Sequence, residues 1–556
     1  MSKYTIGLDY GSLSGRGILS DISNGNIVAQ EVFDYPHGVI SEHLSDGTAL
    51  PHGWALQDPQ DYLLVLDAVI PALLNKSRIL PESIIGIGIA FTAGTIIAVD
   101  ESNTPLCNLP EYTGRPHAYA KLWKHHGAQK EAEQIETIAT EHSATFLNRY
   151  GGKISSESML SKILQTYHED PALYRAADHF VEAGDWVSSL LAGSEIRSGS
   201  MASCKMMWDK NSGYPTPSFL ADLEPELADL GKKLGGTAGK PIYAYPWEKA
   251  GELSAEMAEK LGLCPGTAIA APQMDGYAAL PATGVTEPGQ MLMMAGTSTA
   301  MLLLSHNDMY VPGICAGVKD SGLPGYYCYA AGQASTGDCF QWFVDNCVPA
   351  IYSNTADKGN LDLHQYFTRL ASRMSPGETG LIALDWWNGN KSNLVDADLS
   401  GVIIGLSLQT KPEHIYRALL EATAFGANSI IRNYEKHGIS VDTITACGGI
   451  AEKNSLLMQI YADVLKRPVY VNHCRQAAAL GAAIHAATAA GKGSDGWATV
   501  YDAIEAMADR RFTPYFPSEK SSQTYRKLMN EYVLLHDYFG CHGNDVMKRL
   551  RSLQNT

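Results

Sequence analysis

Two short hairpins, one near the start of each half of the chain, constrain the fold more than any other feature of these 556 residues. In the first, the apolar strands 4–10 and 16–21 surround a turn rich in glycine and serine. In the second, the strand Q-M-L-M-M-A, the turn G-T-S-T and the strand A-M-L-L-L-S fill residues 290–305. The repeat predicts two related domains, residues 1–286 and 287–556, that face one cleft.

The remaining patterns alternate between helix and strand, which is typical of an α/β protein. Apolar spacing predicts helices over residues 61–74, 413–437 and 454–465, and apolar runs predict strands over 84–90, 267–274 and 443–447. Pro412 suits the first turn of a helix and Gly438 suits its end.

Composition excludes several classes of function. Lys and Arg number 42 and Asp and Glu 59, so the net charge is −17, which argues against a nucleic-acid partner. The ten cysteines form no CxxC pair, so buried reduced thiols and a cytoplasmic location are expected. The sequence has no apolar run of about 18 residues, so we expect no membrane span, and the N-terminus has no cleavage signature.

The first hairpin tip offers groups that suit a bound anion or metal. Asp9 ends an apolar strand, where a carboxylate is costly to bury unless it meets a cation or hydrogen-bond donors. Gly11 lets the backbone approach a ligand closely, and Ser12 and Ser14 offer hydroxyls beside the turn amides. An ordinary hairpin with a polar tip is the alternative.

Two further turns in the second half suit a nucleotide. Hydroxyls and amides of the second tip could hold a phosphate, although Ser and Thr are also common in plain turns. A strand, two glycines and a helix start follow one another at residues 446–454, where a flat ring could lie against the backbone; a tight turn is the alternative. The candidate residues are Gly296, Thr297, Ser298, Thr299, Gly448 and Gly449.

Asp275 follows a strand and opens a predicted helix. An aspartate at such a place most often caps the helix. The functional alternative is a base that accepts the proton of an alcohol, a role that the loose transition state of phosphoryl transfer allows even to a weak base. No GxxxxGK[ST] motif occurs in the sequence.

Together these segments resemble the FGGY carbohydrate kinases, which share the actin/hexokinase-type ATPase fold. The resemblance covers residues 6 to about 491 and includes G-L-D-Y-G-S, W-A-L-Q-D-P, Q-M-D-G, G-T-S-T, C-G-G-I-A-E-K-N and A-A-L-G-A-A. It implies an N-terminal sugar-binding domain and a C-terminal nucleotide-binding domain, ATP and Mg²⁺ as cofactors, and transfer of the γ-phosphoryl group to a sugar hydroxyl.

Within the family, four segments resemble those of the ribulokinases: F-T-A-G-T, K-L-W-K-H-H, S-C-K-M-M-W and L-D-W-W-N-G. The resemblance implies that Ala93, Trp123, Lys205 and Gln333 line the sugar pocket. One position departs from the pattern, because Ala330 stands where those kinases carry a glutamate. A lost carboxylate removes an acceptor for a sugar hydroxyl, worth about 1.5–3 kcal/mol if nothing replaces it.

The resulting hypothesis assigns each residue a role. Asp9 holds Mg²⁺ through water. Asp275 is the base and also touches the sugar. Arg16 and Asn454, together with the two hairpin tips and the two glycines, are expected to bind ATP. The expected substrate is a ketopentose, L-ribulose first, and we also expect a homodimer. The alternatives are a kinase for xylulose, D-ribulose, erythrulose or a polyol, a catalytically silent sugar- or nucleotide-binding regulator, and an actin- or chaperone-like ATPase.

Overall fold

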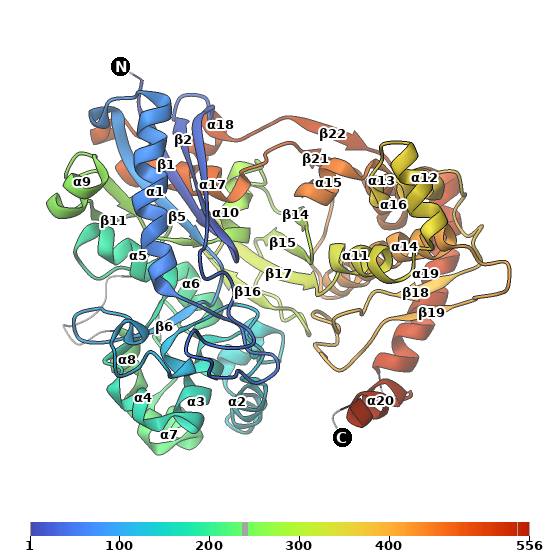
Figure 1. Ribbon diagram of the computed structural model, residues 1–556, viewed down its shortest axis with the longest axis horizontal. Helices are drawn as coiled ribbons and strands as arrows, with labels where there is room; N and C mark the ends of the chain where they lie inside the picture. Colours follow the sequence, from blue (N-terminus) through green and yellow to red (C-terminus); the bar gives the residue numbers. More distant parts are fainter. Residues whose placement is uncertain (1, 236–242, 542, 555–556) are drawn as a thin grey trace. The chain divides into compact units, whose positions relative to one another are not determined.

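The computed structural model describes residues 2–235, 243–541 and 543–554, which form two compact units (Figure 1). Unit 1 comprises residues 1–286, 318–326 and 476–509, and unit 2 comprises residues 287–317, 327–475 and 510–556. The first break between the units therefore falls after Thr286, and two later segments of the chain fold with unit 1.

The central sheet of unit 1 is built around the first hairpin. Its strand order is β11-β12-β5-β1-β2-β3, in which β1 and β2 are antiparallel while β5 runs parallel to β1. A short strand, β13, continues the parallel edge beside β5. The bounds are β1 Tyr4–Tyr10, β2 Ser14–Asp21, β3 Ile27–Asp34, β5 Ile84–Phe91, β11 Lys249–Glu252, β12 Ala268–Ala270 and β13 Gln273–Met274.

Helices cover both faces of this sheet. Leu8 and Gly17 are paired and thus share a face, where a Cβ added at Gly17 would lie 2.5 Å from Val69 of α1 (Pro59–Ser77). Gly7 points to the opposite face, where an added Cβ would lie 1.9 Å from the carbonyl oxygen of Ala479 in α17 (Ala477–Ala490). Because Gly7 has no side chain, α17 can pack directly against the backbone of β1.

A second layer of unit 1 surrounds a small sheet of order β4-β7-β6-β8. Its strands are β4 Leu56–Gln57, β6 Ile96–Val99, β7 Ala120–Lys121 and β8 His179–Glu182, and β9 Arg197–Ser198 pairs with β10 Tyr243–Ala244. The helices of the unit include α2 Gln129–Glu141, α3 Met159–Glu169, α4 Pro171–Ala176, α5 Ala183–Ala192, α6 Gly199–Lys205, α7 Pro217–Leu223, α8 Leu230–Gly235, α9 Ala255–Leu261, α10 Asp275–Ala282 and α18 Val500–Met507.

Unit 2 repeats the plan of unit 1. Its sheet has the order β16-β17-β15-β14-β20-β21-β22, with β14 and β15 as the antiparallel hairpin and β20 parallel to β14. Its outer strand β22 is antiparallel to β21, as β11 is to β12. The bounds are β14 Gln290–Ala295, β15 Thr299–Ser305, β16 Ala316–Lys319, β17 Tyr327–Gln333, β20 Thr443–Cys447, β21 Val469–Asn472 and β22 Phe512–Tyr515.

Helices pack around the unit 2 sheet, with a core that includes Trp386 and Tyr434. They include α11 Gly337–Asn346, α12 Ala350–Lys358, α13 Leu363–Ala371, α14 Pro412–Lys436, α15 Gly449–Lys453, α16 Ser455–Leu465, α19 Glu519–Gly540 and α20 Val546–Gln554, and β18 Ile382–Leu384 pairs with β19 Val402–Ile404. Among the described residues, no helix combines the length and the apolar character that crossing a bilayer needs.

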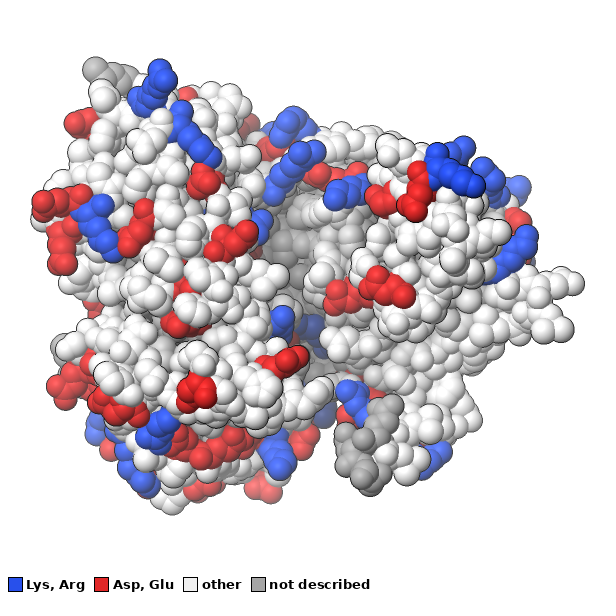
Figure 2. Space-filling model, viewed as in Figure 1, with Lys and Arg blue, Asp and Glu red and all other residues white. Residues whose placement is uncertain are grey.

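The sequence patterns predicted the α/β class and the two hairpins, and both are confirmed. One expected strand, 267–274, is interrupted: β12 ends at Ala270 and β13 starts at Gln273, because Pro272 between them cannot donate a backbone hydrogen bond. On the face drawn in Figure 2, Lys and Arg lie among Asp and Glu and form no single basic patch among the described residues.

Candidate active site

The two candidate aspartates lie at one edge of the unit 1 sheet. Asp9 pairs with Ala90 on one side of β5, and Gln273 pairs with the same residue on the other side. Asp275 follows two residues later, at the start of α10. The carboxyl ends of three parallel strands therefore bring both carboxylates together, at the edge where open α/β sheets commonly bind ligands.

The surroundings of Asp9 suit a cation. The pKa of Asp9 is raised to about 7, chiefly by burial and next by the nearby charge of Asp275, while Arg16 opposes the rise. The Nε atom of Arg16 lies 3.5 Å from Oδ2 of Asp9, and the Asp9 side chain is only 14% exposed. The charge of Asp275 disfavours the charged form of Asp9, and a bound divalent cation would remove that penalty. Carboxylate oxygens are also the ligands that Mg²⁺ uses, together with water and substrate phosphates.

The tip of the first hairpin contacts a segment predicted to line the sugar pocket. The amide of Gly11 donates to the carbonyl of Ser14 at 3.0 Å, which closes the turn. The indole of Trp123 donates to the hydroxyl of Ser12 at 3.0 Å, and Gln57 donates to the Ser12 carbonyl at 2.8 Å. The structure therefore joins Ser12, a candidate phosphate ligand, to Trp123, a candidate sugar contact.

A second part of the candidate sugar pocket forms where β5 ends. Ala93 lies in the loop after β5, and its neighbour Gly94 has a φ of +70°, which glycine adopts without strain. A Cβ added at Gly94 would lie 3.6 Å from Cδ of Lys205, so this loop packs against the lysine. Lys205 ends α6, and its Nζ lies 3.5 Å from Oε2 of Glu157. Sequence reasoning missed Glu157, which no local pattern marks.

In unit 2, the second hairpin tip, residues 296–299, forms hydrogen bonds with the segment that begins α11. The amide of Thr336 donates to the carbonyl of Thr297 at 2.8 Å, and the amide of Gly337 donates to the carbonyl of Gly296 at 3.0 Å. The hydroxyls of Thr299 and Thr336 lie 2.8 Å apart. Sequence reasoning missed Thr336 and Gly337, although a threonine and a glycine before a helix are a local sign of such a junction.

The two candidate glycines lie beside that tip. β14 and β20 are parallel, so Ala295, which ends β14, and Gly448, which directly follows β20, lie at the same edge. Gly448 has a φ of +98°, and a Cβ added there would lie 2.6 Å from the carbonyl oxygen of Ala295. Among the described residues, no atom lies near the Cβ position of Gly449. Within the second tip, the amide of Gly296 donates a hydrogen bond to the carbonyl of Ser298. Backbone without side chains therefore lines this edge, as a nucleotide site requires.

Two of the expected ligands have side chains that also serve the fold. Asn454 caps α16, because its Oδ1 accepts from the amide of Leu457 at 3.0 Å. The Nδ2 of Asn454 donates to the hydroxyl of Thr368 at 3.3 Å, and the residue is only 8% exposed. Asn454 lies between α15, which begins at Gly449, and α16, and both ends of its amide are already bonded within unit 2.

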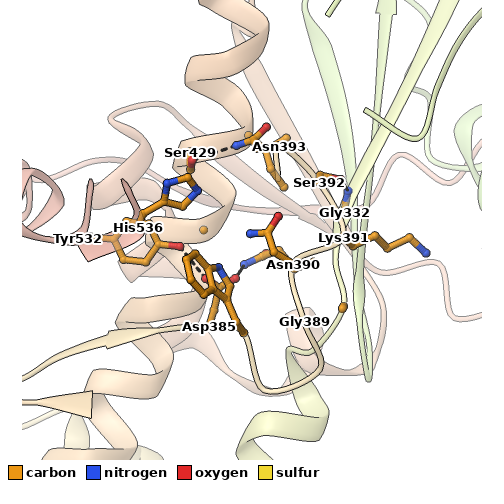
Figure 3. A pocket seen from close by; sticks show the side chains of 15 residues that line it. Gly332, Asp385, Gly389, Asn390, Lys391, Ser392, Asn393, Ser429, Tyr532 and His536 are labelled. Atoms are coloured by element: carbon orange, nitrogen blue, oxygen red, sulfur yellow. Dashed lines mark hydrogen bonds between the residues drawn. The ribbon is translucent and has the colours of Figure 1, made fainter. Parts of the chain in front are cut away.

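Gln333 is the second such residue, and it lines a pocket inside unit 2 (Figure 3). Its Nε2 donates to Asp385 at 2.7 Å and to the carbonyl of Thr423 at 2.8 Å. The hydroxyl of Tyr532 donates to the other oxygen of Asp385 at 2.7 Å, and burial raises the pKa of this carboxyl. Gln333 thus has only its buried Oε1 left to accept a hydrogen bond from a ligand.

Comparison with known proteins identifies the family to which the chain belongs. The model of the N-terminal domain of the FGGY family of carbohydrate kinases matches residues 4–281, and the model of its C-terminal domain matches residues 291–490. The ribulokinase of Shouchella clausii is 48% identical and aligns with 100% of this chain and 98% of its own length. The ribulokinase of Mycolicibacterium smegmatis is 41% identical, over 100% and 97%.

Solved structures share the fold at lower identity. A xylulose kinase from Rhodospirillum rubrum aligns with a TM-score of 0.76 at 23% identity, over 96% of this chain and 98% of that one. A glycerol kinase from Plasmodium falciparum, solved with ADP, gives 0.72 at 18% identity, over 96% and 98%. The α/β architecture of two duplicated units is therefore common to kinases that act on different substrates.

Proposed function

Because the chain belongs to the FGGY family of carbohydrate kinases, we propose that it transfers the γ-phosphoryl group of ATP to the terminal hydroxyl of ribulose, L-ribulose first. The observation that carries the choice of sugar is full-length identity of 41–48% to proteins named ribulokinase. The geometry at Asp9 and Asp275 supports the chemistry.

In the proposed reaction, unit 1 binds the sugar and unit 2 binds the nucleotide. Ala93, Trp123 and Lys205 hold the sugar, and Asp275 accepts the proton of its hydroxyl as the oxygen bonds to the γ-phosphorus and ADP leaves. Asp9 would hold Mg²⁺ through water, and the ion would supply positive charge against the phosphate oxygens. Positioning contributes most in such a reaction, since the loose transition state needs little help from a strong base.

The nucleotide contacts are proposed from the polar turns of both units. In unit 2, Gly296, Thr297, Ser298 and Thr299 would hold phosphates, and Gly448 and Gly449 would lie against adenosine, with Asn454 beside them. In unit 1, the amides and hydroxyls of residues 11–14 would bind phosphate oxygens, with Arg16 as a nearby positive charge. Gln333 is proposed to reach the sugar through its remaining oxygen, and the active form is proposed to be a homodimer.

A panel of sugars in a coupled assay of ADP release tests the substrate. L-ribulose should give the highest kcat/KM among L-ribulose, D-ribulose, xylulose and erythrulose. Ala330 stands where the ribulokinase pattern has a glutamate, so one expected acceptor for a sugar hydroxyl is absent and the panel must include other sugars. A kcat/KM about tenfold higher for a different sugar would contradict the choice of L-ribulose. No ADP release with any sugar would contradict the kinase proposal itself.

Replacing the proposed base tests the mechanism. Asp275→Asn should lower kcat by about 10²–10⁴-fold, the usual contribution of general-base catalysis, while calorimetry should show ATP binding retained. Asp61→Asn is a matched control, because Asp61 is a buried carboxylate of α1 whose oxygens accept from His37 at 2.8 and 3.2 Å. An Asp275→Asn enzyme that keeps the wild-type kcat would refute the assignment.

A further inference from the structure

Helix α3 carries a lysine whose whole side chain is buried and whose amine joins two distant segments. Lys162 is 0% exposed. Its Nζ donates to the carbonyl of Gly94 at 2.7 Å and to the carbonyl of Leu122 at 2.8 Å. Gly94 directly follows Ala93, and Leu122 directly precedes Trp123. One amine therefore fixes the backbone beside two of the proposed sugar contacts.

The third proposed sugar contact touches the same arrangement. The Gly94 backbone packs against Lys205, and a Cβ added at Gly94 would also lie 2.9 Å from the carbonyl oxygen of Glu157. Any shift of Gly94 would therefore displace a wall of the pocket beside Lys205 and Glu157. Because protein interiors pack densely, such a shift would be transmitted and not absorbed.

Burying the charged amine of Lys162 costs free energy. The pKa of Lys162 is lowered to about 7, chiefly by burial; Glu157 and Glu182 oppose the fall and Lys205 adds to it. Glu182 is also 0% exposed; its pKa is raised to about 8, chiefly by burial, and a hydrogen bond from the Gly94 backbone opposes that rise. Replacing buried charges by well-packed apolar residues is often neutral or stabilising. Stability alone therefore gives no reason for an amine at this place.

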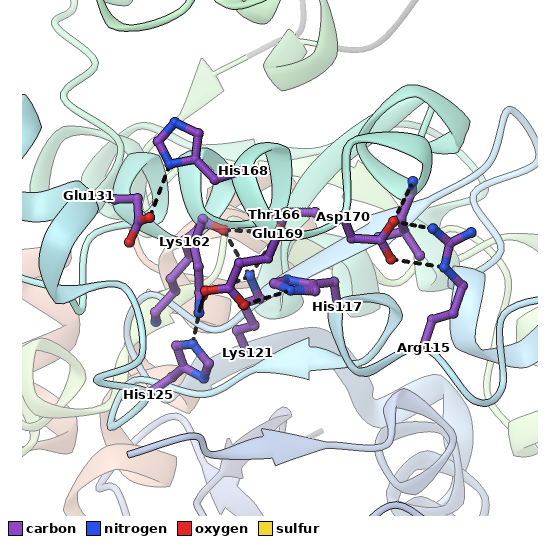
Figure 4. A network of polar contacts seen from close by, with 12 residues as sticks. Arg115, His117, Lys121, His125, Glu131, Lys162, Thr166, His168, Glu169 and Asp170 are labelled. Carbon is purple, nitrogen blue, oxygen red and sulfur yellow. Dashed lines mark hydrogen bonds and ion pairs between the residues drawn. The ribbon is translucent and has the colours of Figure 1, made fainter. Parts of the chain in front are cut away.

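A neighbouring lysine provides an internal comparison. Lys121 of β7 is 2% exposed, and burial lowers its pKa to about 7 as well. Its Nζ, however, donates to the backbone and side chains of α3: the carbonyl of Lys162, Gln165 and Thr166, at 2.9, 3.1 and 2.7 Å (Figure 4). Lys121 thus fastens α3 to the small sheet, whereas Lys162 extends from α3 to the carbonyls beside the sugar contacts.

We propose that Lys162 is a positioning residue of the sugar site, which holds the loop of Ala93 and the segment of Trp123 in register through the carbonyls of Gly94 and Leu122. The inference rests on the proposed function, because the sugar contacts are part of it. Lys162 itself does not touch the sugar. It acts through the backbone that presents Ala93 and Trp123.

Steady-state kinetics of the full chain with matched variants test this role. In Lys162→Met, the KM for the best sugar of the panel should rise about tenfold or more, while the KM for ATP stays within about twofold, because misplacing a binding wall weakens only the ligand that touches it. Lys121→Met loses an equally buried amine and should leave the sugar KM within about threefold of wild type. If Lys162→Met does not fold, as judged by circular dichroism, Lys162→Arg replaces it. The longer, forked guanidinium cannot occupy the position of the amine between the two carbonyls, so the sugar KM should rise in this variant as well.

Each outcome decides between the proposals. An unchanged sugar KM in the folded Lys162 variants, equal rises in the KM values for sugar and ATP, or an equal effect of Lys121→Met would overturn the positioning role and leave the proposed function intact. A wild-type chain that turns over no sugar of the panel would overturn the proposed function and this inference together.

Discussion

A buried histidine in α17 should make the stability of unit 1 depend on pH in a calculable way. His485 is 1% exposed, its Nε2 has no hydrogen-bond partner among the described residues, and burial lowers its pKa from 6.5 to about 3. The unfolded chain therefore binds a proton at a higher pH than the folded chain does. It follows that stability is lost as the pH falls below about 6.5.

The size of the loss follows from the two pKa values. At pH 5 an imidazole with a pKa of about 6.5 is almost fully protonated in the unfolded chain, while an imidazole with a pKa of about 3 is neutral in the folded one. The difference between pH 7 and pH 5 amounts to about 2 kcal/mol. This is a large part of the roughly 5–15 kcal/mol that stabilises a typical domain.

Urea unfolding at pH 7 and pH 5, followed by circular dichroism, measures this loss. Other groups titrate in the same range, so the informative quantity is the difference between wild type and His485→Leu. Lowering the pH should cost the wild type about 2 kcal/mol more than it costs His485→Leu. Ile484→Val changes the same buried helix without removing a titrating group, and it should keep the wild-type dependence. If His485→Leu loses as much stability as the wild type on acidification, the reasoning fails.

Three glycines give further predictions. Gly448→Ala strains a φ of +98° and places a Cβ 2.6 Å from the carbonyl oxygen of Ala295, so the KM for ATP should rise about tenfold in steady-state assays while the KM for sugar does not. Gly481→Ala places a Cβ 1.6 Å from the carbonyl oxygen of Ala278, and urea unfolding should report a loss of about 3 kcal/mol. At Gly231 in α8 an added Cβ meets no neighbouring atom of the described part of the chain, so Gly231→Ala should raise the free energy of unfolding by about 0.4–1 kcal/mol. If Gly231→Ala loses as much stability as Gly481→Ala, the packing argument is wrong.

The parts of the site that sequence predicts are those that local patterns encode. Asp9 lies near the end of an apolar strand, and Asp275 and Gly448 each follow one. A strand end beside a turn is visible in a window of ten residues. The carboxyl ends of parallel strands meet at one edge of a sheet, and β1 and β13 both run parallel to β5, so Asp9 and Asp275 lie at the same edge. The two hairpins were predictable for the same reason, and with them the duplicated plan of the units.

The parts that sequence did not reveal depend on contacts between distant segments. Lys162 joins residues 40 and 68 positions away, and nothing near it in the chain marks an amine that will be buried. Gln333 looks like a pocket residue from its motif, yet its amide is bound to Asp385 and to the carbonyl of Thr423. Which donors remain for a ligand is decided by tertiary packing, because a buried polar group takes the nearest satisfactory partner.

Because residues 476–509 fold with unit 1, the alanine-rich helix α17 lies beside the elements that carry the two aspartates. Helix α17 packs against β1 at Gly7, two residues before Asp9, and its own Gly481 packs against α10, which begins at Asp275. A larger side chain at either glycine would push one carboxylate-bearing element away from the other. The spacing of the two carboxylates is therefore set by a helix from the far end of the sequence that carries neither of them. We expect substitutions along this contact to alter kcat even where they leave every proposed ligand unchanged.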